Sequence, residues 1–231
     1  MKTIGLLGGM SWESTVSYYQ AINRGIAARL GGLHSAKMLL YSTDFEEIEL
    51  LQRQGNWDRA GAELAAAARS LEGAGADFIV LATNTMHKVA PAIEDALTIP
   101  FLHIADATAA KIASAGLEKV GLLGTRFTME QDFYRGRLCE THGLEVLIPP
   151  EQDRARVHAV IYDELCHGEI RPGSRAEYRR IVDDLVAQGA DGVILGCTEI
   201  GLLIDQQDAA VPLFDTAQIH AECAVEHALA D

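Results

Sequence analysis

Two stretches of the chain, GADFIVLATNT at residues 75–85 and GADGVILGCTE at residues 189–199, decide the fold. Each begins with Gly-Ala-Asp, continues into an apolar run and ends on hydroxyl, amide or thiol side chains. Aligning Gly75 with Gly189 gives an offset of 189 − 75 = 114 and places Thr83 opposite Cys197. The chain therefore carries one strand-and-loop unit twice, with different chemistry in its two loops.

The repeat extends beyond these stretches. IGLLG at residues 4–8 returns as VGLLG at 120–124, an offset of 120 − 4 = 116. IPF at 99–101 returns as VPL at 211–213, an offset of 211 − 99 = 112. Three matches in one order, with nearly constant offsets, indicate duplication of an α/β unit.

Apolar runs bounded by turn residues alternate along the chain with segments of helical period, which is typical of βαβ units and a mostly parallel sheet. The Ser-Arg-Ala-Glu run that begins at Ser174 also predicts a capping box. Strands are predicted at residues 3–7, 36–41, 78–82, 101–102, 120–123, 145–147, 193–195 and 213–214. Helices are predicted at residues 12–29, 57–72, 86–96, 105–115, 129–139, 153–167, 174–188 and 216–229.

The predicted fold class is α/β, with two pseudo-symmetric domains that each hold a mostly parallel sheet flanked by helices. Residues 1–98 plus 212–231 are expected to form the N-terminal α/β domain, and residues 99–211 the second. Ligands of open parallel sheets collect outside the carboxyl ends of the strands. The loops that begin at Thr83 and Cys197 fall at that edge, so an active site in the interdomain cleft is expected.

Composition excludes several function classes. The net charge of −14 and the absence of a basic run argue against nucleic acid as a partner. No apolar stretch approaches the roughly 20 residues of a membrane helix, so no membrane partner is expected. Four cysteines without CxxC spacing favour reduced thiols and a cytoplasmic location. The histidines and cysteines lack metal-ligand spacing, and no motif for a cofactor is present, so neither a metal nor a cofactor is expected.

Cys197 is the first candidate for catalysis, because it lies at the predicted carboxyl end of a strand and polar residues follow it. Nearby amide donors are expected to lower its thiol pKa, so that it can accept a proton near neutrality. Thr83 is its candidate partner in the duplicated scaffold, although a turn residue or helix cap would look the same. His87 is either a structural histidine or a residue that tunes a neighbouring group.

At these residues the chain resembles the aspartate/glutamate racemases, a family of cofactor-independent amino-acid racemases. The resemblance lies in GGM at residues 8–10, DFEEIELLQRQG at 44–55, ATNTMHK at 82–88 and GCTEIGLL at 196–203. Within the family the chain is most similar to the L-aspartate/glutamate-specific racemases of enteric-type bacteria. The resemblance implies an isomerase that racemises L-aspartate and L-glutamate without pyridoxal phosphate, and commonly a homodimer.

The resemblance also implies a two-base mechanism. Cys197 is expected to take the Cα proton of the L-enantiomer, and Thr83, which stands where most relatives have cysteine, to return a proton toward the D-enantiomer. The resemblance further implies that substrate-binding residues are Met10, Gln52, Asn84, Thr85, Thr198 and Glu199.

The chain departs from its relatives at Cys166, which stands where they often have a lysine, so the distal carboxylate must be recognised elsewhere. Arg53 is a possible cation for that purpose. A hydantoin racemase, a maleate isomerase and a non-catalytic amino-acid sensor are the alternative functions.

Overall fold

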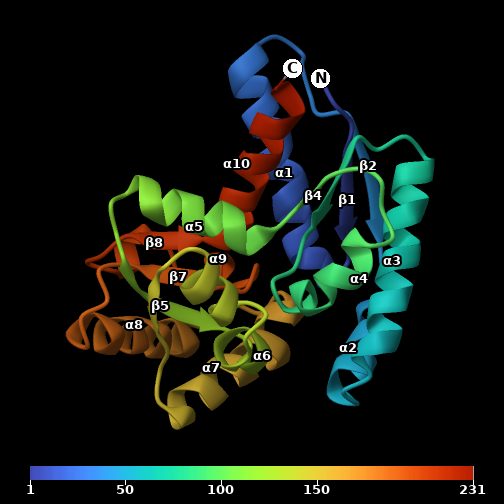
Figure 1. Ribbon diagram of the computed structural model, residues 1–231. Helices are drawn as coiled ribbons and strands as arrows, with labels where there is room; N and C mark the ends of the chain where they lie inside the picture. The colour runs from blue at the N-terminus through green and yellow to red at the C-terminus, as the bar shows by residue number, and fades with distance from the viewer. Residues whose placement is uncertain (231) are drawn as a thin grey trace. The chain divides into compact units, whose positions relative to one another are not determined.

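The computed structural model describes residues 1–230, which form two compact α/β units (Figure 1). Unit 1 comprises Met1–Ile104 together with the chain from His220 onward, and unit 2 comprises Ala105–Ile219. Each unit holds one four-stranded sheet in which every neighbouring pair of strands is parallel. The predicted α/β class with two similar halves is confirmed.

The two sheets have the same strand order, β2-β1-β3-β4 in unit 1 and β6-β5-β7-β8 in unit 2. The strands of unit 1 are β1 (Ile4–Gly8), β2 (Met38–Ser42), β3 (Phe78–Leu81) and β4 (Phe101–Leu102). The strands of unit 2 are β5 (Lys119–Gly124), β6 (Glu145–Leu147), β7 (Val193–Gly196) and β8 (Leu213–Asp215). The repeated stretches thus form β3 and β7, which occupy equivalent places beside β1 and β5.

Helices connect the strands in both units, as βαβ crossovers require. Unit 1 has α1 (Trp12–Leu30), α2 (Phe45–Arg53), α3 (Trp57–Gly73), the 3₁₀ helix η1 (Thr85–Val89) and α4 (Ala90–Glu94). Unit 2 has α5 (Ile104–Ser114), α6 (Arg126–Glu130), the π-helix η2 (Arg137–Thr141), α7 (Glu151–Asp163), η3 (Leu165–His167), α8 (Pro172–Ala187), α9 (Ile200–Leu203) and η4 (Gln206–Asp208). Helix α10 (Thr216–Leu229) follows β8 and runs into unit 1. None of the helices within residues 1–230 combines the length and apolar character needed to cross a membrane.

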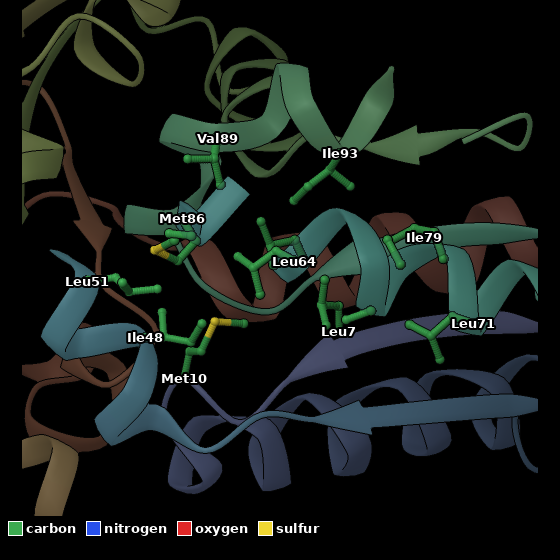
Figure 2. Close-up of a cluster of buried hydrophobic side chains, with 14 of the residues drawn as sticks. Leu7, Met10, Ile48, Leu51, Leu64, Leu71, Ile79, Met86, Val89 and Ile93 are labelled. Carbon is green, nitrogen blue, oxygen red and sulfur yellow. The ribbon is translucent and has the colours of Figure 1, made fainter. Parts of the chain in front are cut away.

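One part of the core of unit 1 lies between its sheet and α3. Leu7 on β1 and Ile79 on β3 pack with Leu64 and Leu71 of α3 in one cluster of buried side chains (Figure 2). Every residue of β1 and β3 is buried, which explains why these strands read as continuous apolar runs. Full burial of each such side chain contributes about 1.5–3 kcal/mol, so these apolar runs fix the position of the strands.

The glycine that precedes each repeated strand has the same backbone conformation. Gly75 has φ 100° and Gly189 has φ 96°, values in the region that favours glycine over other residues. The residue identity and the backbone conformation are therefore both preserved in the two copies, which supports the repeat.

The structure corrects several predicted elements. Helix α8 begins at Pro172 with Arg171 as its N-cap, so Ser174 lies inside the helix and no capping box begins there. Proline at this position is common, because it needs no N–H partner in the first turn. The helix predicted at 86–96 is η1 followed by α4, and that predicted at 129–139 is interrupted between α6 and η2. Helix α2 was not predicted.

The sheets also place two strands differently from the expected domain boundaries. Residues 99–211 were expected to form the second domain, yet β4 pairs with β3 in the sheet of unit 1. Strand β8 pairs with β7 in the sheet of unit 2, although residues 212–231 were expected in the first domain. The final strand of each half is short, so the sequence gives little indication of which sheet it joins.

Candidate active-site loops

The first candidate loop follows β3 in unit 1. Thr83, Asn84 and Thr85 are all buried, and η1 starts at Thr85. The Thr83 N–H donates to the Leu81 carbonyl at 2.9 Å, and the Thr83 carbonyl lies 2.7 Å from His87 Nδ1. Both backbone polar groups of Thr83 are thus occupied, so its hydroxyl is presented by a fixed stretch of backbone.

The second candidate loop follows β7 in unit 2. The Cys197 thiol donates to Oε2 of Glu199 at 2.9 Å, and the Thr198 hydroxyl donates to the same oxygen at 2.9 Å. All three side chains are buried. A single carboxylate oxygen of Glu199 therefore accepts two hydrogen bonds, one of them from the thiol.

The electrostatics of Cys197 differ from the prediction. Burial raises the thiol pKa well above its ordinary value, and the neighbouring Glu199 carboxylate raises it further. Both causes disfavour the thiolate, because burial removes the water that would stabilise the negative charge and Glu199 repels it. The Glu199 backbone N–H lowers this pKa as expected, but burial and the carboxylate outweigh it, so the net shift is opposite to the expected one and Cys197 rests as a thiol.

Cys166, at the position where relatives often carry lysine, lies in η3. Burial raises the pKa of its thiol, and the charge of Glu199 contributes to the shift. A protonated thiol cannot supply the positive charge of a lysine. Arg53 is mostly exposed and forms an ion pair with Glu49 at 3.1 Å, one turn earlier in α2.

Met10 and Gln52 lie in the interior of unit 1. Met10 is 2% exposed and belongs to the apolar cluster, near Ile48 in Figure 2. Gln52 is buried on α2 and its Nε2 lies 2.9 Å from Sδ of Met86, which belongs to η1. Through Met86, Gln52 is linked to the helical turn that follows Thr83, while Met10 occupies a core position.

Of the predicted residues, the structure brings Thr83, Asn84 and Thr85 together in unit 1, and Cys197, Thr198 and Glu199 together in unit 2. It also reveals two contacts that were not predicted, Glu199 with Cys197 and His87 with the Thr83 carbonyl. The sequence signal for the first was a carboxylate two residues after a strand-end cysteine. Within residues 1–230, no group of three or more metal-ligating side chains is arranged to hold a metal ion.

A cavity of about 350 Å³ lies elsewhere in unit 1, at the carboxyl end of β2. Residues from Tyr41 to Asp44 line one side, and Glu63 and Ala67 of α3 belong to another. None of the predicted site residues lines this cavity. The candidate chemistry is therefore identified by the loops after β3 and β7 rather than by this hollow.

Comparison with known proteins identifies the family of the chain. The family model described as Asp/Glu/Hydantoin racemase matches residues 7–224. The chain belongs to the Asp/Glu/hydantoin racemase family. It is therefore a racemase, an isomerase that inverts a carbon stereocentre.

Individual relatives support the family assignment over the full chain. A crystal structure of a candidate Asp/Glu racemase from Yersinia pestis is 59% identical, covers 100% of both chains and superimposes with a TM-score of 0.92. An aspartate racemase homologue from Pyrococcus horikoshii OT3 is 36% identical, covers 99% of both chains and has a TM-score of 0.83. The Broad specificity amino-acid racemase RacX of Bacillus subtilis (strain 168) is 26% identical over 236 residues, which cover 98% of both chains.

Proposed function

We propose that this racemase interconverts the enantiomers of aspartate and glutamate without pyridoxal phosphate, with Cys197 and Thr83 as its two proton-transfer residues. The observation that carries the proposal is the contact between the Cys197 thiol and the Glu199 carboxylate. A thiol that rests protonated needs a base before it can take a proton from carbon, and a carboxylate within 2.9 Å supplies one. Thr83 occupies the equivalent point after β3, as the second proton-transfer residue requires.

The proton transfers balance as follows when the L-enantiomer reacts. Glu199 takes the thiol proton, and the Cys197 sulfur takes the proton from Cα, which leaves a carbanion and a neutral Glu199. The Thr83 hydroxyl then donates its proton to the opposite face of the carbanion. The Thr83 alkoxide recovers a proton from water, and Glu199 returns its proton to water, which restores the resting state.

Donors for the substrate α-carboxylate are assigned to the same loops. Asn84 and Thr85 lie directly after Thr83, and donors fixed in this way stabilise developing negative charge without reorganisation. The Thr198 hydroxyl already donates to Glu199, so we assign its backbone N–H, rather than its hydroxyl, to the substrate.

Exchange of the Cα proton with solvent deuterium tests the proposal. Purified protein in D₂O should incorporate deuterium into L-aspartate or L-glutamate, and absence of incorporation into both would refute the assignment. Cys197→Ser should abolish nearly all exchange. Glu199→Gln keeps the shape of the side chain but removes the base, so it should reduce exchange by about 10²–10⁴-fold. Thr83→Cys should speed conversion of the D-enantiomer, since a thiol forms its anion more readily than a hydroxyl.

A broader amino-acid specificity is the second candidate, and the neutral Cys166 favours it. Neither Cys166 nor the ion-paired Arg53 offers an evident free cation for a distal carboxylate. The relative from Bacillus subtilis is itself named a broad specificity racemase. A panel of acidic, neutral and basic amino acids and a hydantoin separates these substrate classes by exchange rate, and conversion of maleate to fumarate tests the isomerase activity.

We further propose a homodimer, and the outer face of α1 supports it. Trp12, Val16 and Tyr19 are 61%, 45% and 54% exposed, and their spacing places them on one face of the helix. Exposed apolar groups gathered in this way mark interaction surfaces. Sedimentation of Tyr19→Glu should show monomer where the natural protein shows dimer, and a monomeric natural protein would refute the proposal.

We also propose a cytoplasmic location, because the four cysteines are free thiols, and cell fractionation tests it.

A further inference from the structure

Two hydrogen bonds hold His87 in one protonation form. The backbone N–H of Ile104 donates to His87 Nε2 at 3.2 Å, so Nε2 carries no proton. His87 Nδ1 lies 2.7 Å from the Thr83 carbonyl oxygen, which can only accept, so Nδ1 carries the proton. The contacts therefore select a neutral imidazole protonated at Nδ1.

A second buried histidine holds the same stretch of chain. His220 Nε2 lies 2.9 Å from the Leu102 carbonyl oxygen and donates to it, and His220 Nδ1 accepts from the Tyr18 hydroxyl at 3.0 Å. Residues 102–104 are thereby fixed by His220 at one end and offer the Ile104 N–H to His87 at the other. All of these groups belong to unit 1.

The other half of the duplicated scaffold has no counterpart of His87. The offset of 114 that aligns Thr83 with Cys197 aligns His87 with residue 87 + 114 = 201, which is Gly201. A Cβ added at Gly201 would lie 2.3 Å from Oδ2 of Asp215, so a side chain at this position would have to displace that carboxylate. We call the two hydrogen bonds of His87, to the Thr83 carbonyl and from the Ile104 N–H, the imidazole clamp. The clamp is thus specific to the loop that carries Thr83.

We infer that His87 is a positioning residue for Thr83, which it serves by holding the Thr83 carbonyl with its Nδ1–H. The inference rests on the proposed role of Thr83 as a proton donor. The Leu81 carbonyl already holds the Thr83 N–H, so the clamp fixes the second peptide group of the residue. With both peptide groups fixed, the direction of the hydroxyl depends only on rotation of its side chain.

The clamp should matter on one face of the substrate only. Proton removal from the L-enantiomer depends on Cys197 and Glu199, whereas reprotonation to the D-enantiomer depends on Thr83. A displaced Thr83 leaves the carbanion to recapture a proton on the Cys197 face. The substrate then returns as deuterated L-aspartate, without inversion.

A matched pair of variants isolates the Nδ1 contact. His87→Asn places an amide N–H near the position of Nδ1 and keeps the donor to Thr83, whereas His87→Gln keeps an acceptor near Nε2 for Ile104. His87→Gln should lower kcat for L-to-D conversion by about 10²-fold at unchanged KM, the cost of a small misplacement of a reacting group. His87→Asn should stay within about tenfold of the natural protein. Both should incorporate deuterium into recovered L-aspartate at rates close to the natural one.

Three results decide the inference. Equal losses in the two variants, or parallel losses of exchange and racemisation, would overturn it. Thr83→Ala is the separate control, because it should abolish inversion but retain exchange. If Thr83→Ala racemises normally, the proposed function fails, whatever the His87 variants do. Should the variants not fold, nitrogen NMR of the natural protein still decides, since a His87 protonated at Nε2, or at both nitrogens at pH 7, contradicts the clamp.

Discussion

Acidification from pH 7 to pH 5 should lower the free energy of unfolding by about 2 kcal/mol through His220 alone. Complete burial lowers the pKa of this imidazole from 6.5 to about 4, opposed by its bond to the Leu102 carbonyl. Because the folded pKa is depressed, the stabilisation is fully present above pH 6.5 and is lost as the pH falls toward 4. The pKa difference, 6.5 − 4 = 2.5, corresponds to about 3 kcal/mol over the full range.

Denaturant unfolding of the natural protein and of His220→Gln at pH 7 and pH 5 measures this contribution. Glutamine keeps an N–H near the position of Nε2 for the Leu102 carbonyl but does not titrate in this range. The natural protein should lose about 2 kcal/mol more than the variant between the two pH values, while other titrating groups cancel in the subtraction. A difference below about 0.5 kcal/mol would refute the reasoning, since such a value means that the buried imidazole charges as easily as an exposed one.

Three further predictions concern unit 2. Ser174→Ala removes the hydroxyl that donates to the buried Glu164 carboxylate at 2.5 Å, so chemical denaturation should show a loss of about 1–3 kcal/mol. An unchanged midpoint would count against it. Gly124→Ala places a Cβ 2.7 Å from the Gly196 carbonyl oxygen of β7. The free energy of unfolding should fall by about 1–3 kcal/mol and racemisation should slow. Gly173→Ala is the control, because a Cβ there meets no atom within 4 Å. Iodoacetamide should label Cys197 slowly at pH 7 and faster as the pH rises above about 9, because its pKa is raised, and rapid labelling at pH 7 in peptide-resolved mass spectrometry would contradict that direction.

The strands could be predicted from the sequence because burial on both faces leaves an unmistakable pattern. FIVL of β3 and VILG of β7 are buried throughout, and each follows a glycine with positive φ. These local features need no knowledge of the rest of the chain. The equal order of strands in the two sheets follows from the same repeat, since duplicated units fold alike.

Short helices were harder to predict because they offer few turns over which a hydrophobic period can be recognised. Helix α2 has nine residues and starts after Asp44, whose side chain accepts from the Glu46 N–H. Helix α6 ends at Glu130 because Gln131 adopts an extended backbone with ψ 150°. Neither the short length of the first nor the abrupt end of the second is encoded in hydrophobic spacing.

The candidate site was predictable as a set of residues but not as a set of contacts. The repeat identified Thr83 and Cys197. The direction in which the Cys197 pKa shifts, however, depends on burial and on where the Glu199 carboxylate points. The sequence alone allows two roles for His87, a structural histidine or one that tunes a neighbouring group. Only its bonds to Thr83 and Ile104 distinguish these roles. Linear order cannot reveal which nitrogen of an imidazole carries the proton.

The path of the chain through its two units has a consequence for biosynthesis. Unit 2 is one continuous stretch, Ala105–Ile219, so a ribosome releases all of it before His220 emerges. Unit 1 draws on both early and late parts of the chain, and Tyr18 receives its imidazole partner only with the final helix. A nascent chain can therefore mature its second half first. The loop that carries Thr83 therefore reaches its finished environment only after His220 has emerged.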